Sequence, residues 1–249
     1  MLNRVPEVTL YFWIIKIMAT TVGETGADFL AFTMNFGLAA TSYIMSALLA
    51  VVLWNQFRLK RYVPVSYWAV VVLVSIVGTL ITDRLVDEMG VSLLTTTIVF
   101  SVALLGVFAW WYVSEGTLAM HSIKTTKREL FYWAAILLTF ALGTAAGDLL
   151  AEGTGLGYAI SALLFGSVIG LIAIAYYRFG LNGVLTFWLA YVLTRPLGAS
   201  IGDLLSQPVK NGGLGFGTVG TTIAFTTTIA ILIVYLSIKQ KPPQLNKLN

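Results

Sequence analysis

The sequence predicts an all-α, polytopic membrane protein with eight transmembrane helices, and three observations carry this prediction. Of the 249 residues, 58% are hydrophobic and only 10% are charged, whereas soluble domains carry about 25% charged residues. The apolar residues form stretches of about 20 residues, the length of helix that crosses a hydrocarbon core of about 30 Å. These stretches also pair into four similar units, each of two helices.

Short polar or glycine-containing segments separate the predicted spans. In chain order, the spans are expected at residues 8–30, 36–57, 64–86, 91–114, 129–151, 156–178, 182–205 and 217–238. Residues 1–238 are expected to form one transmembrane domain, with repeats at 6–57, 64–116, 128–180 and 181–238. The polar residues 239–249 are expected to form a cytoplasmic tail.

Basic residues are distributed unequally between the two sets of connecting segments. With the N-terminus inside, the inner segments hold Arg4, Arg58, Lys60, Arg61, Lys124, Lys127, Arg128, Arg178, Lys239, Lys241 and Lys247. The outer segments hold only Arg84 and Lys210, together with the acids Asp87, Glu88 and Glu152. The positive-inside rule therefore predicts that both termini are cytoplasmic.

The composition also restricts the chemistry. Cysteine is absent and His121 is the one histidine, which excludes disulfides, thiolate or histidine-cluster metal sites and Ser-His or Cys-His catalysis. No other nucleophile–base pair is visible, so we expect no enzyme activity. The basic residues lie in short loops between apolar spans, so the high pI indicates membrane topology rather than nucleic-acid binding.

The odd-numbered spans share a motif in which a tryptophan is followed ten residues later by glycine and fifteen residues later by aspartate. The tryptophans are Trp13, Trp68, Trp133 and Trp188. The glycines are Gly23, Gly78, Gly143 and Gly198, and the aspartates are Asp28, Asp83, Asp148 and Asp203. The even spans share a weaker mark, a Gly or Ser followed four residues later by a hydroxyl residue, as in Gly37 and Thr41.

This pattern resembles a family of bacterial membrane proteins of unknown function, built from four tandem two-helix repeats that each carry a characteristic tryptophan. The resemblance covers residues 6–238 and rests on four matches to the tryptophan–glycine–aspartate spacing. It implies the repeat architecture and a bacterial inner membrane, and it implies no activity.

Two helices per repeat place every repeat in the same orientation, so the repeats are parallel rather than inverted. The tryptophans are then expected at the cytoplasmic interface, where aromatic residues anchor helices. The aspartates lie about 22 Å further along. If the odd helices surround one axis, their carboxylates converge into an outer acidic ring; otherwise they sit shallowly and bond the outer loops.

Departures from the repeat indicate where a site is expected. Only the first repeat has an acid, Glu24, one turn before its aspartate. Lys16 and Arg195 are the two basic residues within spans, and each is expected to find an acid on another helix or to remain as a gate. If both neutralise acids, about three negative charges remain.

The repeat glycines allow two interpretations. Small residues permit close helix packing, or the helix breaks near them and frees carbonyls for ligand contact. Candidate hinge residues are Gly23, Gly143, Pro196 and Gly198.

We therefore expect a membrane transporter or channel-like protein for a small cation. Oxygen ligands without thiolate or imidazole favour a divalent ion such as manganese, with proton binding as an alternative or coupled step. The expected cation ligands are Glu24, Asp28, Asp83, Asp148 and Asp203, with Glu24 and Asp28 as the metal-binding core and Lys16 and Arg195 as gating or charge-compensating residues. Hydroxyls at Thr20, Thr21, Thr25, Thr79, Thr144 and Ser200 are further candidates.

Two alternatives remain open at this stage. One is a transporter of a small organic solute, with Lys16 or Arg195 holding a carboxylate group. The other is a scaffold or sensor that transports nothing, in which the acids only shape loops. The lipid bilayer is the expected partner in every case, and the oligomeric state is left open.

Overall fold

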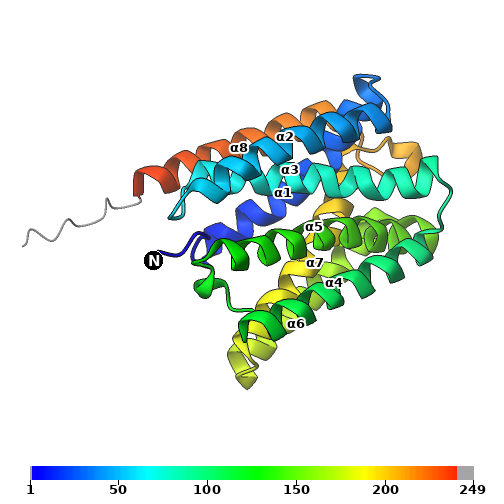
Figure 1. Cartoon of the computed structure of the whole chain (residues 1–249). Coiled ribbons are helices and arrows are strands. Elements are labelled where there is room, and N and C mark those ends of the chain that lie inside the picture. Colours follow the sequence, from blue (N-terminus) through cyan, green and yellow to red (C-terminus); the bar gives the residue numbers. More distant parts are fainter. Residues whose placement is uncertain (1, 240–249) are drawn as a thin grey trace, which may run out of the picture.

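Eight long α-helices make up most of the computed structural model, which describes residues 2–239 (Figure 1). They are α1 (Leu10–Asp28), α2 (Leu38–Arg58), α3 (Pro64–Asp83), α4 (Leu93–Glu115), α5 (Thr126–Asp148), α6 (Tyr158–Phe179), α7 (Gly183–Ser206) and α8 (Gly217–Lys239). Short 3₁₀ turns lie at Met120–Ser122 and Val209–Asn211. The described residues contain no strand. The all-helical prediction is therefore confirmed, and most of the predicted tail lies outside the described residues.

Seven of these helices are long and apolar enough to cross a membrane. The exception is α1, which carries Lys16, Glu24 and Asp28. The chain is thus a multi-pass membrane protein, whereas the eighth span and the orientation of the termini stay predictions.

The odd helices form an inner ring. Helix α1 packs against α3 and α7, and α5 packs against the same two helices from the other side. In α3 and α7, 67% of the most apolar segment is buried, and in α5 61%, against 11–28% in the even helices. The odd helices therefore surround a common axis. This is the condition under which the aspartates are expected from the sequence to converge.

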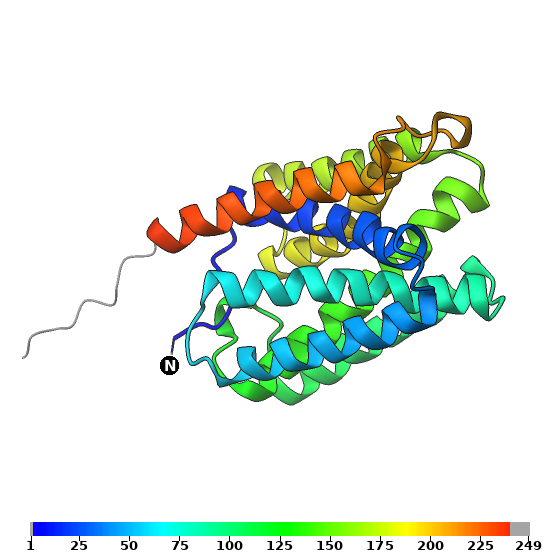
Figure 2. The ribbon, with the colours of Figure 1, turned by 90° about the horizontal axis from the view of Figure 1, so that it is seen from above.

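The even helices form an outer layer in which each packs on the odd helix of the following repeat. Helix α2 lies on α3, α4 on α5, α6 on α7, and α8 returns to lie on α1 (Figures 1 and 2). Because the last repeat packs on the first, the four repeats close into a ring.

The repeat glycines lie where neighbouring odd helices approach most closely. A Cβ at Gly23 would overlap Ser75 of α3, and a Cβ at Gly198 would overlap Thr20 of α1. The same holds for Gly78 against Phe140 and for Gly143 against Arg195. In every case the neighbour stands three residues before the glycine of its own repeat, so one contact recurs four times around the ring. These glycines thus set the spacing and register of the inner helices.

The repeat tryptophans are inside the protein rather than on its lipid-facing surface. Trp68, Trp133 and Trp188 are only 1%, 4% and 5% exposed, and Trp13 is half-buried. The indole of Trp188 donates to the Leu118 carbonyl at 2.9 Å. The expectation of interfacial anchors is therefore wrong for Trp68, Trp133 and Trp188, because a buried and a lipid-facing aromatic give the same local sequence pattern.

The weak mark of the even helices is an N-terminal cap. Gly37 precedes α2 with φ of 76°, a left-handed conformation that favours glycine. The Thr41 hydroxyl donates back to the Gly37 carbonyl at 2.7 Å. The same bond starts α4, from Thr96 to Ser92, and α8, from Thr221 to Gly217, whereas the Ser161 hydroxyl of α6 has no partner among the described residues.

Irregular backbone follows the aspartates instead of the glycines. A π-helical turn succeeds the aspartate in three repeats, at Phe29–Thr33, Arg84–Glu88 and Leu149–Gly153. In the fourth repeat, α7 continues as an α-helix to Ser206.

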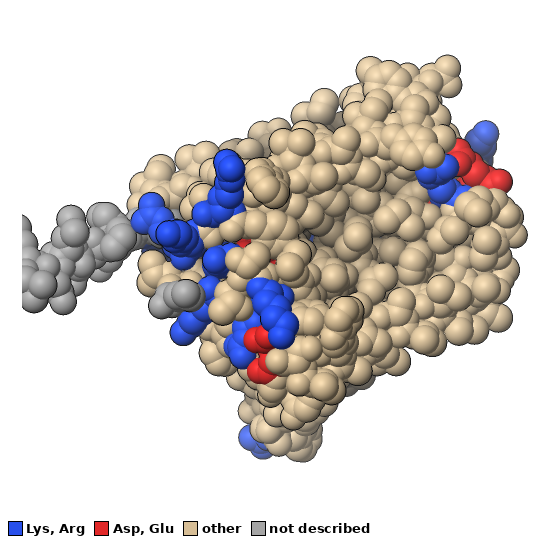
Figure 3. All heavy atoms as spheres, viewed as in Figure 1, with Lys and Arg blue, Asp and Glu red and all other residues tan. Residues whose placement is uncertain are grey.

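Charged residues gather at the two ends of the bundle. Figure 3 shows Lys and Arg concentrated at the end where the chain begins, with a wide uncharged band between the ends. This band is the surface expected of a membrane-embedded bundle, and the basic end is the one that the sequence predicts to be cytoplasmic.

Candidate cation site on the ring axis

Arg195 of α7 reaches the axis of the ring and bonds to the other three odd helices. Its Nη2 donates to Glu24 Oε2 at 2.7 Å, to Thr144 Oγ1 at 2.6 Å and to Thr79 Oγ1 at 2.5 Å. These three residues occupy one equivalent position, directly after the repeat glycine, and the fourth equivalent is Ala199. The arginine therefore fills a four-sided site whose fourth side carries only a methyl group.

The α-helix runs unbroken through Arg195 and Pro196. The aliphatic stem of Arg195 lies against Gly143, where a side chain would collide with it. Arg195 is completely buried, and its Nε and Nη1 groups have no hydrogen-bond partner in the described part of the chain.

Lys16 lies further toward the basic end, also near the axis and also completely buried. Its Nζ stands 4.0 Å from the centre of the Phe140 ring and 4.3 Å from that of Tyr191. It has no hydrogen-bond partner among the described residues. The ammonium group of Lys16 therefore contacts the faces of two aromatic rings. An acid on another helix is the partner expected from the sequence in that place.

Aromatic side chains close the axis beyond Lys16. The residues eleven positions before each glycine are Phe12, Tyr67, Tyr132 and Phe187. The hydroxyls of Tyr67 and Tyr132 share a hydrogen bond, and the rings of Phe12 and Phe187 are 6.0 Å apart. This aromatic layer separates the axial charges from the basic end of the bundle.

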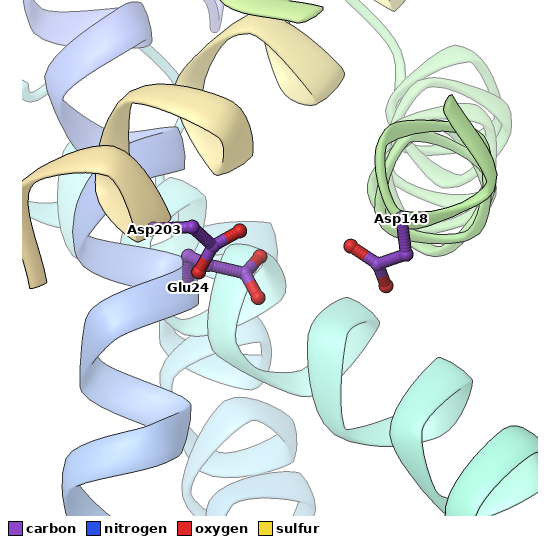
Figure 4. Close-up of side chains that lie close together, drawn as sticks. All are labelled: Glu24, Asp148 and Asp203. Atoms are coloured by element: carbon purple, nitrogen blue, oxygen red, sulfur yellow. The ribbon is translucent and has the colours of Figure 1, made fainter. Parts of the chain in front are cut away.

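Toward the opposite end, three carboxylates converge. Glu24 of α1, Asp148 of α5 and Asp203 of α7 each offer an oxygen, and the three oxygens lie within 4.8 Å of one another. Figure 4 shows Glu24 and Asp203 side by side, with Asp148 facing them from across the axis. Oxygens that share one divalent ion at about 2.1–2.5 Å can be up to about 5 Å apart, so the spacing fits a single ion.

Glu24 can serve both the arginine and an ion. Its bond to Arg195 uses Oε2, which leaves Oε1 for a second partner. Asp203 is buried at 7% exposure and Asp148 is half-buried. The Ser200 hydroxyl is buried and has no hydrogen-bond partner among the residues that the structure describes.

Asp28 and Asp83 lie at the edge of this group. Both are half-buried and within electrostatic range of Glu24. The cluster therefore joins Glu24 to acids of α5 and α7, whereas the sequence paired it with Asp28 on its own helix. Which acids lie beside Glu24 depends on which helices are neighbours, and residue spacing along one helix does not reveal this.

Loop bonding is not what positions these aspartates. Asp28, Asp83 and Asp148 stand directly before the π-helical turns, and none of the three makes a side-chain capping bond there. This observation weighs against the interpretation in which the acids only shape the outer loops.

The proposed hinges lie in regular helix. Helix α1 is unbroken at Gly23, α5 at Gly143, and α7 at Pro196 and Gly198. The glycines provide close packing in this structure, and irregular backbone begins only after the aspartates.

Sequence reasoning missed the axial partners of the two bases. Thr79 and Thr144 were candidates for a cation, but their contact in the structure is Arg195. Phe140 and Tyr191 were not considered at all. A signal was available, because Thr79 and Thr144 occupy the repeat position of Glu24 and therefore face the same axis.

Comparison with protein families gives one match, described as a repeat of unknown function (DUF347). It matches four times, at residues 11–62, 66–117, 131–181 and 186–241. Neither the curated proteins nor the solved structures give a match. The four matched segments coincide with the four two-helix units of the ring.

Proposed function

Since the chain belongs to the DUF347 repeat family, whose description names no activity, we propose a function from the site itself. We propose that the protein is a membrane transporter or channel-like protein for a small cation, with a divalent ion such as Mn²⁺ as the first candidate. All eight long helices would span the membrane, with both termini in the cytoplasm of a bacterium.

The convergence of Glu24, Asp148 and Asp203 carries this proposal. Carboxylates within a membrane-embedded bundle are costly and in general mark ion or proton pathways. These three come from three helices, and their oxygens are close enough for one ion. With Asp28 and Asp83 counted, five carboxyl groups face two bases, Lys16 and Arg195, and this excess of acidic oxygens suits a cation as ligand.

Lys16 and Arg195 would act as the gate. Both positive charges lie on the axis between the acidic cluster and the aromatic layer, so a cation in the cluster meets two like charges before the basic end. The Arg195 guanidinium occupies a place beside Glu24 Oε2 that a bound cation could occupy instead. Passage would require Arg195 to leave Glu24, which suits a carrier that changes conformation better than an open pore.

Manganese flux into reconstituted vesicles tests the proposal. The purified protein is placed in vesicles that contain a Mn²⁺-quenched dye, and the rate of quenching is measured. Glu24→Gln, Asp148→Asn and Asp203→Asn should each reduce uptake by at least about tenfold, as expected for loss of a metal ligand. Asp87→Asn is the matched control, since Asp87 is an exposed acid at the same end and should leave uptake unchanged.

Two results would oppose the proposal. Uptake unchanged in all three cluster variants would exclude the carboxylates as the site. A protein whose melting temperature responds to no metal and no solute would favour the scaffold or sensor.

The organic-solute alternative has one observation in its favour. Arg195 Nε and Nη1 are buried donors without a partner among the described residues, and a carboxylate ligand could accept from either one. In that case Arg195→Gln would abolish solute binding and leave the response to Mn²⁺ intact.

A further inference from the structure

A pocket of about 1240 Å³ opens at the basic end of the bundle, away from the acidic cluster. Four parts of the chain line it: the segment before α1, the turn before α3, the loop before α5, and the last turn of α8. None of its residues belongs to the axial site, apart from Phe12 of the aromatic layer.

The lining is strongly basic. Arg61, His121, Lys124 and Lys239 line the pocket, and Glu7 is the one acid among its lining residues. Arg61 and Lys124 are exposed, and neither forms an ion pair within the part of the chain that the structure describes. The pocket thus presents positive charge that the described protein does not neutralise.

The inner wall is apolar. Phe12, Val63, Trp68 and Leu236 form it, and the Trp68 indole donates to the Tyr62 hydroxyl at 3.2 Å. A pocket with basic groups at its mouth and apolar groups behind them suits a ligand that has an anionic head and a hydrocarbon body.

Backbone bonds hold the walls in place. Tyr62 N–H donates to the Asn3 carbonyl, and Arg4 N–H donates to the Ile123 carbonyl, each at 3.0 Å. The Arg4 guanidinium also pairs at 2.7 Å with the buried Glu129. The segment before α1 is therefore tied to both neighbouring loops, and the basic residues stand on a fixed frame.

We propose that this pocket binds the phosphate headgroup of an anionic phospholipid. Arg61 and Lys124 contact the phosphate, and the first methylenes of the acyl chains lie against the half-buried Val63 and Leu236. Basic pockets between membrane helices recognise such headgroups. This inference is independent of the transported substrate, because the pocket lies on the other side of the aromatic layer.

Native mass spectrometry and thermal unfolding of the delipidated protein in neutral detergent test the proposal. Phosphatidylglycerol is titrated against phosphatidylcholine and against inorganic phosphate. We expect one tightly bound phosphatidylglycerol and a higher melting temperature with that lipid alone. In Arg61→Gln/Lys124→Gln, its dissociation constant should rise about thirtyfold, from the loss of two basic contacts.

The control is Lys60→Gln/Arg178→Gln, which removes the same charge from exposed positions outside the pocket and should bind phosphatidylglycerol like the unaltered protein. Equal loss in both double variants would mean diffuse attraction and overturn the proposal. Inorganic phosphate that raises the melting temperature as much as the lipid would overturn it in favour of a soluble anion. A pocket variant with unaltered lipid affinity would also overturn it.

Discussion

Arg195 of α7 and Glu24 of α1 form a 2.7 Å ion pair across 171 positions of the chain. Their side chains are 0% and 8% exposed, so the pair is shielded from water. The pair joins α1 and α7, the first and last of the odd helices, whose contact closes the ring. It also places Glu24, which has a counter-charge, beside Asp148 and Asp203, which form no ion pair among the described residues. The same contact therefore serves the fold and the candidate site.

Removal of the acid should be costly. Glu24→Gln leaves the Arg195 charge buried without a counter-charge, and breaking a buried pair in this way costs about 3–5 kcal/mol. The free energy of unfolding, measured by denaturant titration in detergent, should fall by this amount. Glu88→Gln is the control, since its pair with Arg84 is partly exposed and worth at most about 1 kcal/mol. Equal losses in the two variants would contradict the role assigned to Glu24.

Lys16 should behave in the opposite way. Lys16→Met removes a buried charge that has no hydrogen-bond partner within residues 2–239 and approximately keeps the side-chain volume. Replacing buried charges by apolar residues is often neutral or stabilising by about 1–4 kcal/mol. We expect a protein that unfolds at an equal or higher temperature and no longer transports normally. Exposed Lys60→Met should change neither property, and a marked loss of stability in Lys16→Met would show that the contacts of Lys16 with Phe140 and Tyr191 outweigh the cost of burying its charge.

The repeat glycines should be sensitive to a single methyl group. In Gly198→Ala the new Cβ would overlap Thr20, and overpacking of this kind costs about 1–3 kcal/mol. Gly106→Ala is the matched control, because nothing lies within 4 Å of a Cβ at that position in α4. Thermal unfolding should show destabilisation in the first variant and none in the second. The ring-spacing role fails if Gly198→Ala is as stable as the unaltered protein.

The predicted topology can be tested without background because the chain has no cysteine. Single cysteines replace exposed Glu7, Asp87 and Arg178, and a membrane-impermeant maleimide labels intact cells. If α1 spans the membrane, Glu7→Cys and Arg178→Cys should be protected together while Asp87→Cys is labelled. Labelling of Glu7→Cys together with Asp87→Cys would show that α1 does not cross.

Much of the fold could be predicted from the sequence because its signals are local and repeated. The eight helices lie within a few residues of the expected spans, for example Gly183–Ser206 against 182–205. The four aligned motifs left convergence of the odd helices open, and the contacts among α1, α3, α5 and α7 decide it. The burial of Trp68 could not be predicted, since a lipid-facing and an interior tryptophan are both surrounded by apolar groups.

The site was predicted less completely, for a physical reason. The acids and bases were all recognised as unusual, but their pairing depends on which helices are neighbours and on their register. That register is set by contacts such as Gly198 with Thr20, and the repeated glycines do not reveal which residue of the neighbouring helix each one faces. The partnership of Arg195 with Glu24 therefore required the structure.

The four-sided position around Arg195 has a consequence for how the chain is built. In an assembly of four identical two-helix subunits, an arginine at this position would appear four times around one axis, and the charges would repel one another. A continuous chain of four unequal copies can place a single guanidinium against one carboxylate and two hydroxyls. Fusion of the repeats into one polypeptide thus gives the axis a chemical asymmetry that rotational symmetry forbids.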